Sequence, residues 1–76
     1  MNEYVVSYIS FFDNELKMVK VSAHCERDAL VEGLFQLSSQ NAQSDVEYFE
    51  DLASKSAEEI KEDMFDTDAA IQALQI

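Results

Sequence analysis

The sequence predicts an α+β fold, with an N-terminal antiparallel β-hairpin followed by two to four α-helices. Two segments near the N-terminus are rich in Val, Ile, Tyr and Phe, as strands are. From residue 26 onward, apolar residues recur at helical spacing. The chain has no proline and one glycine, which favours regular elements over loops. Its 76 residues make a single domain, 1–76, with the hairpin and one helix in 1–38 and an acidic helical half in 44–76.

Residues 3–12 (EYVVSYISFF) and 15–23 (ELKMVKVSA) are the two predicted strands. Between them, Asp13-Asn14 tolerates the positive φ of a two-residue turn. With that turn, Tyr8 faces Val19 and Val6 faces Val21. One face then carries Tyr4, Val6, Tyr8, Val19, Val21 and Ala23, and the other carries Val5, Ile9, Phe11, Leu16 and Met18.

Both faces of this hairpin are apolar, and a two-stranded ribbon is marginally stable alone. One face must therefore meet the helices of the chain. The second face must be covered by the C-terminal helices, by a second copy of the chain or by a partner, and the sequence leaves these three alternatives open.

The first helix is predicted over residues 25–37 (CERDALVEGLFQL), with Cys25 near its N-cap and acids in its first turn. Gly33 costs about 1 kcal/mol relative to Ala inside a helix. We therefore expect the helix to approach the hairpin closely at this glycine. Residues 38–43 (SSQNAQ) form a polar linker.

The acidic half contains two capping-box patterns, at Ser44 to Glu47 and at Ser56 to Glu59. It forms one long helix or two with a break near Ser54, and the sequence does not decide between them. Residues 68–76 (DAAIQALQI) are expected to form a short last helix, capped by Asp66 or Thr67, with Ile71 and Leu74 packed inward. Further strands are expected only from a second chain.

The chain carries 16 acids and 5 bases, for a net charge of −11. Nucleic acid and anionic membranes would repel it, because their binding requires Lys and Arg. A basic protein surface is the favoured kind of partner. Residues 1–38 have a net charge of −3 and residues 39–76 a net charge of −8, so the charge is concentrated in the second half.

The chain has one cysteine, Cys25, and one histidine, His24, which exclude an internal disulfide and a zinc site. The N-terminus lacks the basic start of a signal peptide, and its apolar run is too short to span a bilayer, so we expect a cytoplasmic protein. Adjacent His24 and Cys25 would diverge, and no third group is indicated to orient the imidazole. Asp63, Asp66 and Asp68 do not meet the spacing of a calcium loop. We expect no catalytic residue, no metal site, no cofactor and no enzymatic activity.

The acidic half has two interpretations. Ten acids between Asp45 and Asp68 would extend over about 35 Å of continuous helix, or one charge per ~3.5 Å. A DNA strand carries one phosphate per ~3.4 Å, so the row could imitate a phosphate backbone, or it could be a solvated helix face. The predicted partner-binding residues are Glu47, Asp51, Glu58, Glu59, Glu62, Asp63 and Asp66.

The segment LKMVKVSAHCERDAL, within residues 16–37, resembles the strand-to-helix segment of small phage proteins that inhibit host enzymes, such as the T7-type inhibitor of host RNA polymerase. A compact, acidic chain poor in Gly and Pro also looks like phage anti-restriction and anti-CRISPR proteins, several of which are DNA mimics. The resemblance implies a host-takeover inhibitor in the host cytoplasm. It assigns no functional residue in this chain.

The leading hypothesis is therefore a non-enzymatic acidic binding protein that occupies the basic surface of a nucleic-acid-binding host protein. The alternative is a small structural or assembly module. In that case the chain homodimerises or docks through its second apolar hairpin face, and the acids serve only solubility.

Overall fold

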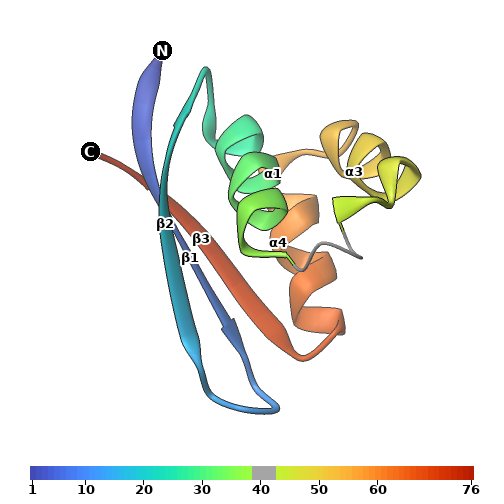
Figure 1. Cartoon of the computed structure of the whole chain (residues 1–76). Coiled ribbons are helices and arrows are strands. Elements are labelled where there is room, and N and C mark those ends of the chain that lie inside the picture. Colours follow the sequence, from blue (N-terminus) through green and yellow to red (C-terminus); the bar gives the residue numbers. More distant parts are fainter. Residues whose placement is uncertain (39–42) are drawn as a thin grey trace.

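A computed structural model describes residues 1–38 and 43–76, which form a sheet covered on one side by helices (Figure 1). All strand pairs are antiparallel in the order β2-β1-β3, so β1 is central. The α+β class and the N-terminal hairpin are confirmed, and the expected range of helices includes the three described. The elements are β1 (Asn2–Ser10), β2 (Leu16–Ala23), α1 (Glu26–Leu37), α3 (Val46–Ala53), α4 (Ala57–Asp66) and β3 (Ala69–Gln75).

The hairpin has the predicted faces but not the predicted register. Val6 pairs with Val19 instead of Val21, a shift of two residues. The cause is a longer connection, Phe11–Glu15, in which Asn14 has a φ of 55° and donates its N–H to the Ser10 carbonyl at 2.8 Å. Because side chains alternate along a strand, a shift of two keeps each side chain on its predicted face.

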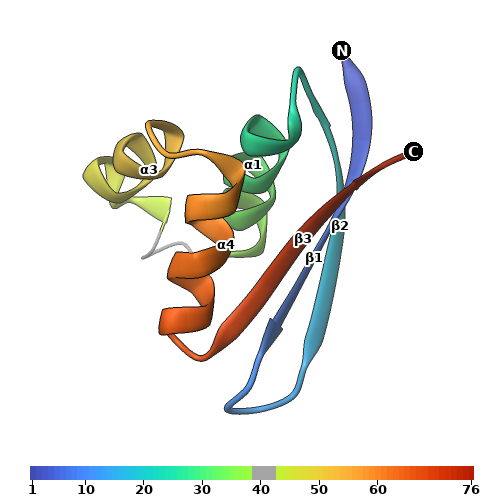
Figure 2. The ribbon, with the colours of Figure 1, turned by 180° about the vertical axis from the view of Figure 1, so that it is seen from behind.

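The helices lie on one side of the sheet, and the other side is bare in both views (Figures 1 and 2). The core between the two layers contains side chains from every described helix and strand. Its buried residues are Tyr4, Val6, Val21, Ala23, Ala29, Leu30, Leu34, Leu52, Ile60, Met64, Ala69, Ile71 and Ala73. Of the three alternatives for the second hairpin face, coverage by the chain's own helices is thus not observed among the described residues.

The expected close approach at Gly33 is confirmed. A Cβ atom at this position would lie 2.5–2.7 Å from three side-chain carbons of Val6, which real contacts essentially never show. Cys25 is the N-cap residue of α1, as expected, although its side chain makes no capping hydrogen bond. Most of the predicted linker falls on residues 39–42, which lie outside the described residues.

The acidic segment is two helices, with the break near Ser54 that the sequence allowed. The capping box at Ser56 and Glu59 is confirmed, with hydrogen bonds of 3.2 and 3.4 Å. The cap of α3 differs from the prediction by one residue. Asp45, rather than Ser44, accepts the hydrogen bond from the Tyr48 amide at 3.2 Å.

The predicted last helix is wrong, because residues 69–75 form strand β3 and complete the sheet beside β1. Thr67 caps the C-terminus of α4, and Asp68, with a φ of 60°, turns the chain toward the sheet. Ile71 is buried as expected, but Leu74 is 57% exposed on the opposite face. The expectation that additional strands could come only from a second chain is wrong for the same reason.

Candidate functional site

The bare side of the sheet, here called the open face, is an apolar surface formed by all three strands. Because side chains alternate along a strand, the residues on the open face are those whose sequence neighbours point into the core. Three of its large side chains are more than half exposed, namely Leu16 and Met18 at 59% each and Leu74 at 57%. The open face consists of Glu3, Val5, Ser7, Ile9, Leu16, Met18, Lys20, Ser22, Ala70, Gln72 and Leu74.

Cross-strand pairing arranges these residues in rows. Ile9 lies between Leu16 and Ala70, which makes one apolar row. The neighbouring row has Ser7 at its centre, flanked by Met18 and Gln72. The open face is therefore mostly apolar, with hydroxyl and amide groups near its middle.

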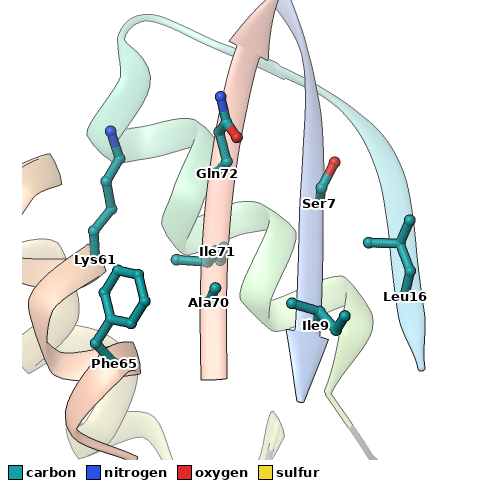
Figure 3. A pocket seen from close by; sticks show the side chains of 8 residues that line it. All are labelled: Ser7, Ile9, Leu16, Lys61, Phe65, Ala70, Ile71 and Gln72. Atoms are coloured by element: carbon teal, nitrogen blue, oxygen red, sulfur yellow. The ribbon is translucent and has the colours of Figure 1, made fainter. Parts of the chain in front are cut away.

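A groove of about 390 Å³ crosses this face (Figure 3). Its floor is formed by Ser7, Ile9, Leu16, Ala70 and Gln72, with Ile71 of β3 beside them. Lys61 and Phe65 reach the groove from α4, on the β3 side. The open face is therefore concave where the groove runs between the strands and α4.

Phe65, which lines the groove, belongs to an aromatic pair. The Phe65 ring is 61% exposed, and its centroid lies 6.4 Å from that of Phe11, which follows the end of β1. Lys61 is held by an ion pair with Glu26 of α1, so its charge is balanced within the chain.

Charge is almost absent from the open face. It carries one acid and one base, Glu3 and Lys20, whose charged atoms lie 3.3 Å apart. By contrast, residues 26–37 and 45–66, here called the helical layer, hold twelve acids and three bases, for a net charge of −9. The molecule thus has a neutral apolar side and an acidic side.

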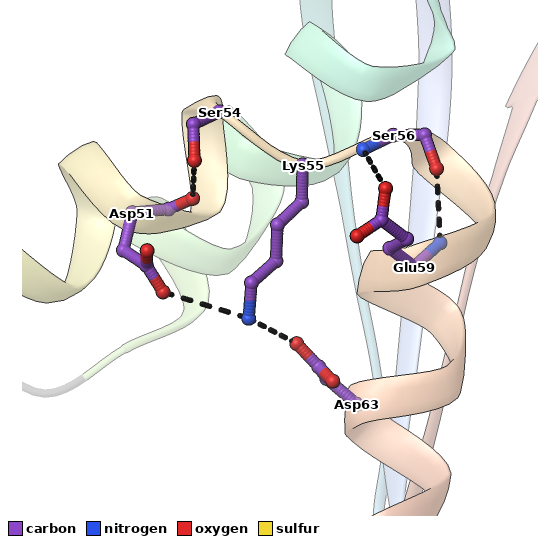
Figure 4. Close-up of polar contacts among 6 residues, drawn as sticks. All are labelled: Asp51, Ser54, Lys55, Ser56, Glu59 and Asp63. Atoms are coloured by element: carbon purple, nitrogen blue, oxygen red, sulfur yellow. Dashed lines mark hydrogen bonds and ion pairs between the residues drawn. The ribbon is translucent and has the colours of Figure 1, made fainter.

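The seven predicted partner-binding acids lie on the helical layer, but they do not form one continuous row, because the chain turns between α3 and α4. Lys55 in this turn pairs with Asp51 at 3.5 Å and also with Asp63 (Figure 4). Glu59 is held in the capping box. The other four, Glu47, Glu58, Glu62 and Asp66, form neither an ion pair nor a capping hydrogen bond among the described residues.

Two groups between α3 and α4 have perturbed acid–base properties. The hydrogen bond from Lys55 to Asp63 raises the pKa of the lysine, with further contributions from both carboxylates. Burial raises the pKa of Tyr48 above its ordinary value of 10.0. Both groups line a second groove of about 280 Å³, together with Asp63 and Asp66. These residues are suited to holding a cation, and Lys55 already supplies one.

The residues considered for catalysis lie elsewhere. His24 and Cys25 are exposed in the turn between β2 and α1, and neither lines either of the two grooves described above. Within the described part of the chain, no three His, Cys, Asp or Glu residues are grouped so as to hold a metal ion. None of the described helices combines the length and apolar character required to cross a membrane.

The sequence prediction missed the side chains that β3 contributes to the open face and those that α4 contributes to its groove. The sequence prediction places Ala70, Gln72 and Leu74 in a helix and gives Phe65 no role. The sequence carries little signal for β3, because the apolar residues of segment 69–75 do not alternate with polar ones. The alternation of core-facing and outward-facing sites is visible only in the structure. Comparison with known proteins found no matching family model, no similar curated protein and no similar solved structure.

Proposed function

We propose that this chain is a non-enzymatic assembly module that docks on another protein chain through its open face. The observation that carries the proposal is the exposure of Leu16, Met18 and Leu74 on the side of the sheet opposite the helices. Contiguous exposed apolar surface typically marks an interaction site.

The shape of the open face supports a protein partner over a small molecule. Small-molecule sites enclose most of the ligand surface. The groove here is bounded by the sheet on one side and by the 61% exposed Phe65 ring on the other. Such a surface suits side chains that project from another folded chain.

A site-specific photocrosslinker tests this proposal. Placed at Met18 on the open face, it is expected to form covalent adducts with protein in a lysate of the native host. Val46, at the start of α3 and 62% exposed, is the matched control position and is expected to form none. Adducts at Val46 alone, or at neither position, would contradict docking through the open face.

A second candidate function uses the helical layer to occupy the basic surface of a nucleic-acid-binding protein. It is favoured by the net charge of −9 on this layer and by Glu47, Glu58, Glu62 and Asp66, which form no ion pair among the described residues. Attraction to Lys and Arg would accelerate association and weaken with added salt.

The test of this candidate neutralises only acids that form no ion pair and no capping hydrogen bond in the described residues. The variant combines Glu47→Gln, Glu58→Gln, Glu62→Gln and Asp66→Asn. We expect it to lose capture of basic host proteins at low salt while Met18→Lys retains capture. Equal capture by the parent and the neutralised variant would eliminate this function and leave the acids a role in solubility.

A further inference from the structure

We propose that the occupant of the open face is a second copy of this chain, which forms a twofold sheet-on-sheet dimer. The inference rests on the proposed docking function and specifies its partner. Two sheets that pack face to face lie about 10 Å apart, with the side chains of both faces interdigitated.

Charge restricts how two such chains can meet. Each copy has a net charge of −11, so contact through the helical layers would bring strongly like-charged surfaces together. The open face has no net charge, because Glu3 and Lys20 balance each other. With open faces in contact, the helical layers would lie about 30 Å apart, several times the ~8 Å Debye length at physiological salt.

The same charge distribution disfavours a basic partner on this face. A basic surface would be attracted to the helical layer, where the negative potential lies, and would gain nothing electrostatic from the open face. A partner for the open face should itself be apolar and close to neutral. The open face of another copy meets both conditions.

The polar groups of the open face are self-complementary. In a twofold interface, the same patch must donate and accept hydrogen bonds, because residues meet reciprocally. The Ser7 hydroxyl and the Gln72 amide each contain a donor and an acceptor, so each can bond to its own kind on the second copy. Glu3 and Lys20 can likewise exchange partners between copies.

The area of the open face determines the expected affinity of the dimer. A nine-residue strand is about 30 Å long and three strands are about 14 Å wide, so each open face covers about 400 Å². Two faces bury about 800 Å², and specific interfaces usually exceed about 1,000 Å². The exposed Phe11 and Phe65 at the border add to this area. We therefore expect a dimer that dissociates in the micromolar concentration range.

Sedimentation velocity over low to high micromolar concentrations tests the dimer. The parent chain is expected to shift from one to two times its 8.6 kDa mass as concentration rises. Met18→Lys should raise the dissociation constant at least tenfold, since it buries a charge in the interface. Val46→Lys makes the same charge change at a site of matched exposure, and it should leave the constant unchanged. Both substitutions reduce the net negative charge, so general repulsion cannot explain a loss of dimer.

Leu74→Lys, on β3, is an independent second variant and should act like Met18→Lys. Circular dichroism checks that each variant folds. A parent chain that keeps a single-chain mass at every concentration would overturn the dimer, yet crosslinking at Met18 to a different protein would still support docking. A dimer that neither variant weakens, or that protects the amides of an edge strand from exchange, would overturn the proposed interface.

Discussion

At the residue scale, the contact between Gly33 and Val6 determines how closely α1 approaches the sheet. Val6 is completely buried at the centre of β1, and Gly33 presents bare backbone to it. Glycine lowers the intrinsic stability of α1 by about 1 kcal/mol relative to alanine. The close contact that it permits offsets that cost through burial of the central strand.

Gly33→Ala is therefore expected to destabilise the fold, although alanine is the better helix former. Its Cβ would overlap the Val6 side chain, and overpacking of this kind costs about 1–3 kcal/mol. We expect a net loss of about 1–2 kcal/mol in the free energy of unfolding, measured with urea. Gln36→Ala, at an exposed site of the same helix, should change it by less than about 0.5 kcal/mol. A stabilised Gly33→Ala variant would show that the helix and strand are farther apart.

Lys55 connects α3 to α4 through Asp51 and Asp63, and its raised pKa makes this connection dependent on pH. Below about pH 10 the lysine is charged in the folded and the unfolded chain, so its full contribution to stability is present. As pH rises through the raised folded-state pKa, this contribution is lost. Burial of Tyr48 acts in the same direction, since it disfavours the phenolate in the folded chain.

Lys55→Met should accordingly be less stable than the parent at neutral pH, and the difference should narrow as the pH rises above 10.5, the ordinary pKa of lysine. Urea denaturation of both proteins across this pH range measures the difference in their free energies of unfolding. Tyr48→Phe serves as a control, because it removes the phenol and keeps Lys55. A difference between Lys55→Met and the parent that stays constant with pH would show that the lysine acts through its aliphatic stem alone.

At the scale of elements, strand β3 shows where sequence-based prediction failed and why. Ala, Leu and Gln favour helices intrinsically, and Ile71 and Leu74 are three residues apart, as on one helix face. The unpaired edge of β1 overrides this preference, since β3 satisfies its backbone groups and buries Ala69, Ile71 and Ala73. A propensity-based prediction has no information about that edge.

The strand assignment has a direct test in two alanine variants. In a helix packed as the sequence suggested, Ile71 and Leu74 would both point inward, whereas in β3 they point to opposite faces. In dilute protein, Ile71→Ala should cost about 2–5 kcal/mol and Leu74→Ala less than about 0.5 kcal/mol. Equal and large losses in both variants would contradict the strand.

The hairpin, by contrast, was predictable in its faces, because alternation in both strands is independent of the turn. Its register was not, since Asp13-Asn14 matches a two-residue turn as well as part of a longer connection. The start of α4 was predictable from Ser56 and Glu59, whose reciprocal hydrogen bonds are local. The complete open face requires the position of β3, and its groove requires that of α4, so only the hairpin part of the open face was predictable from the sequence.

Like charges on α4 lower its stability. Glu62 is four residues from Glu58 and from Asp66, and each such pair costs a few tenths of a kcal/mol. Glu62→Lys would convert both pairs into attractive ones and place a cation near the C-terminus of the helix. We expect a gain of about 1 kcal/mol in the free energy of unfolding, and about half of that for Glu62→Gln. No gain in either variant at low salt would show that these repulsions are already screened.

At the scale of the whole molecule, the layers divide the surface by chemistry. The helices bury one face of the sheet and carry most of the acids, which leaves the other face apolar and nearly neutral. A second copy on the open face would remove that apolar surface from water and place both helical layers outward. The two candidate functions would then be compatible, since a dimer would present an acidic surface on each side.

The most direct measurement is the solvent accessibility of methyl groups, recorded by NMR with a paramagnetic cosolute at low and at high protein concentration. The methyls of Leu16, Met18 and Leu74 should become protected as concentration rises, while those of Val46 stay exposed. If the accessibility of the open-face methyls does not change with concentration, a dimer formed through this face is contradicted. This holds whether the mass of the protein in the sample has doubled or has stayed that of one chain.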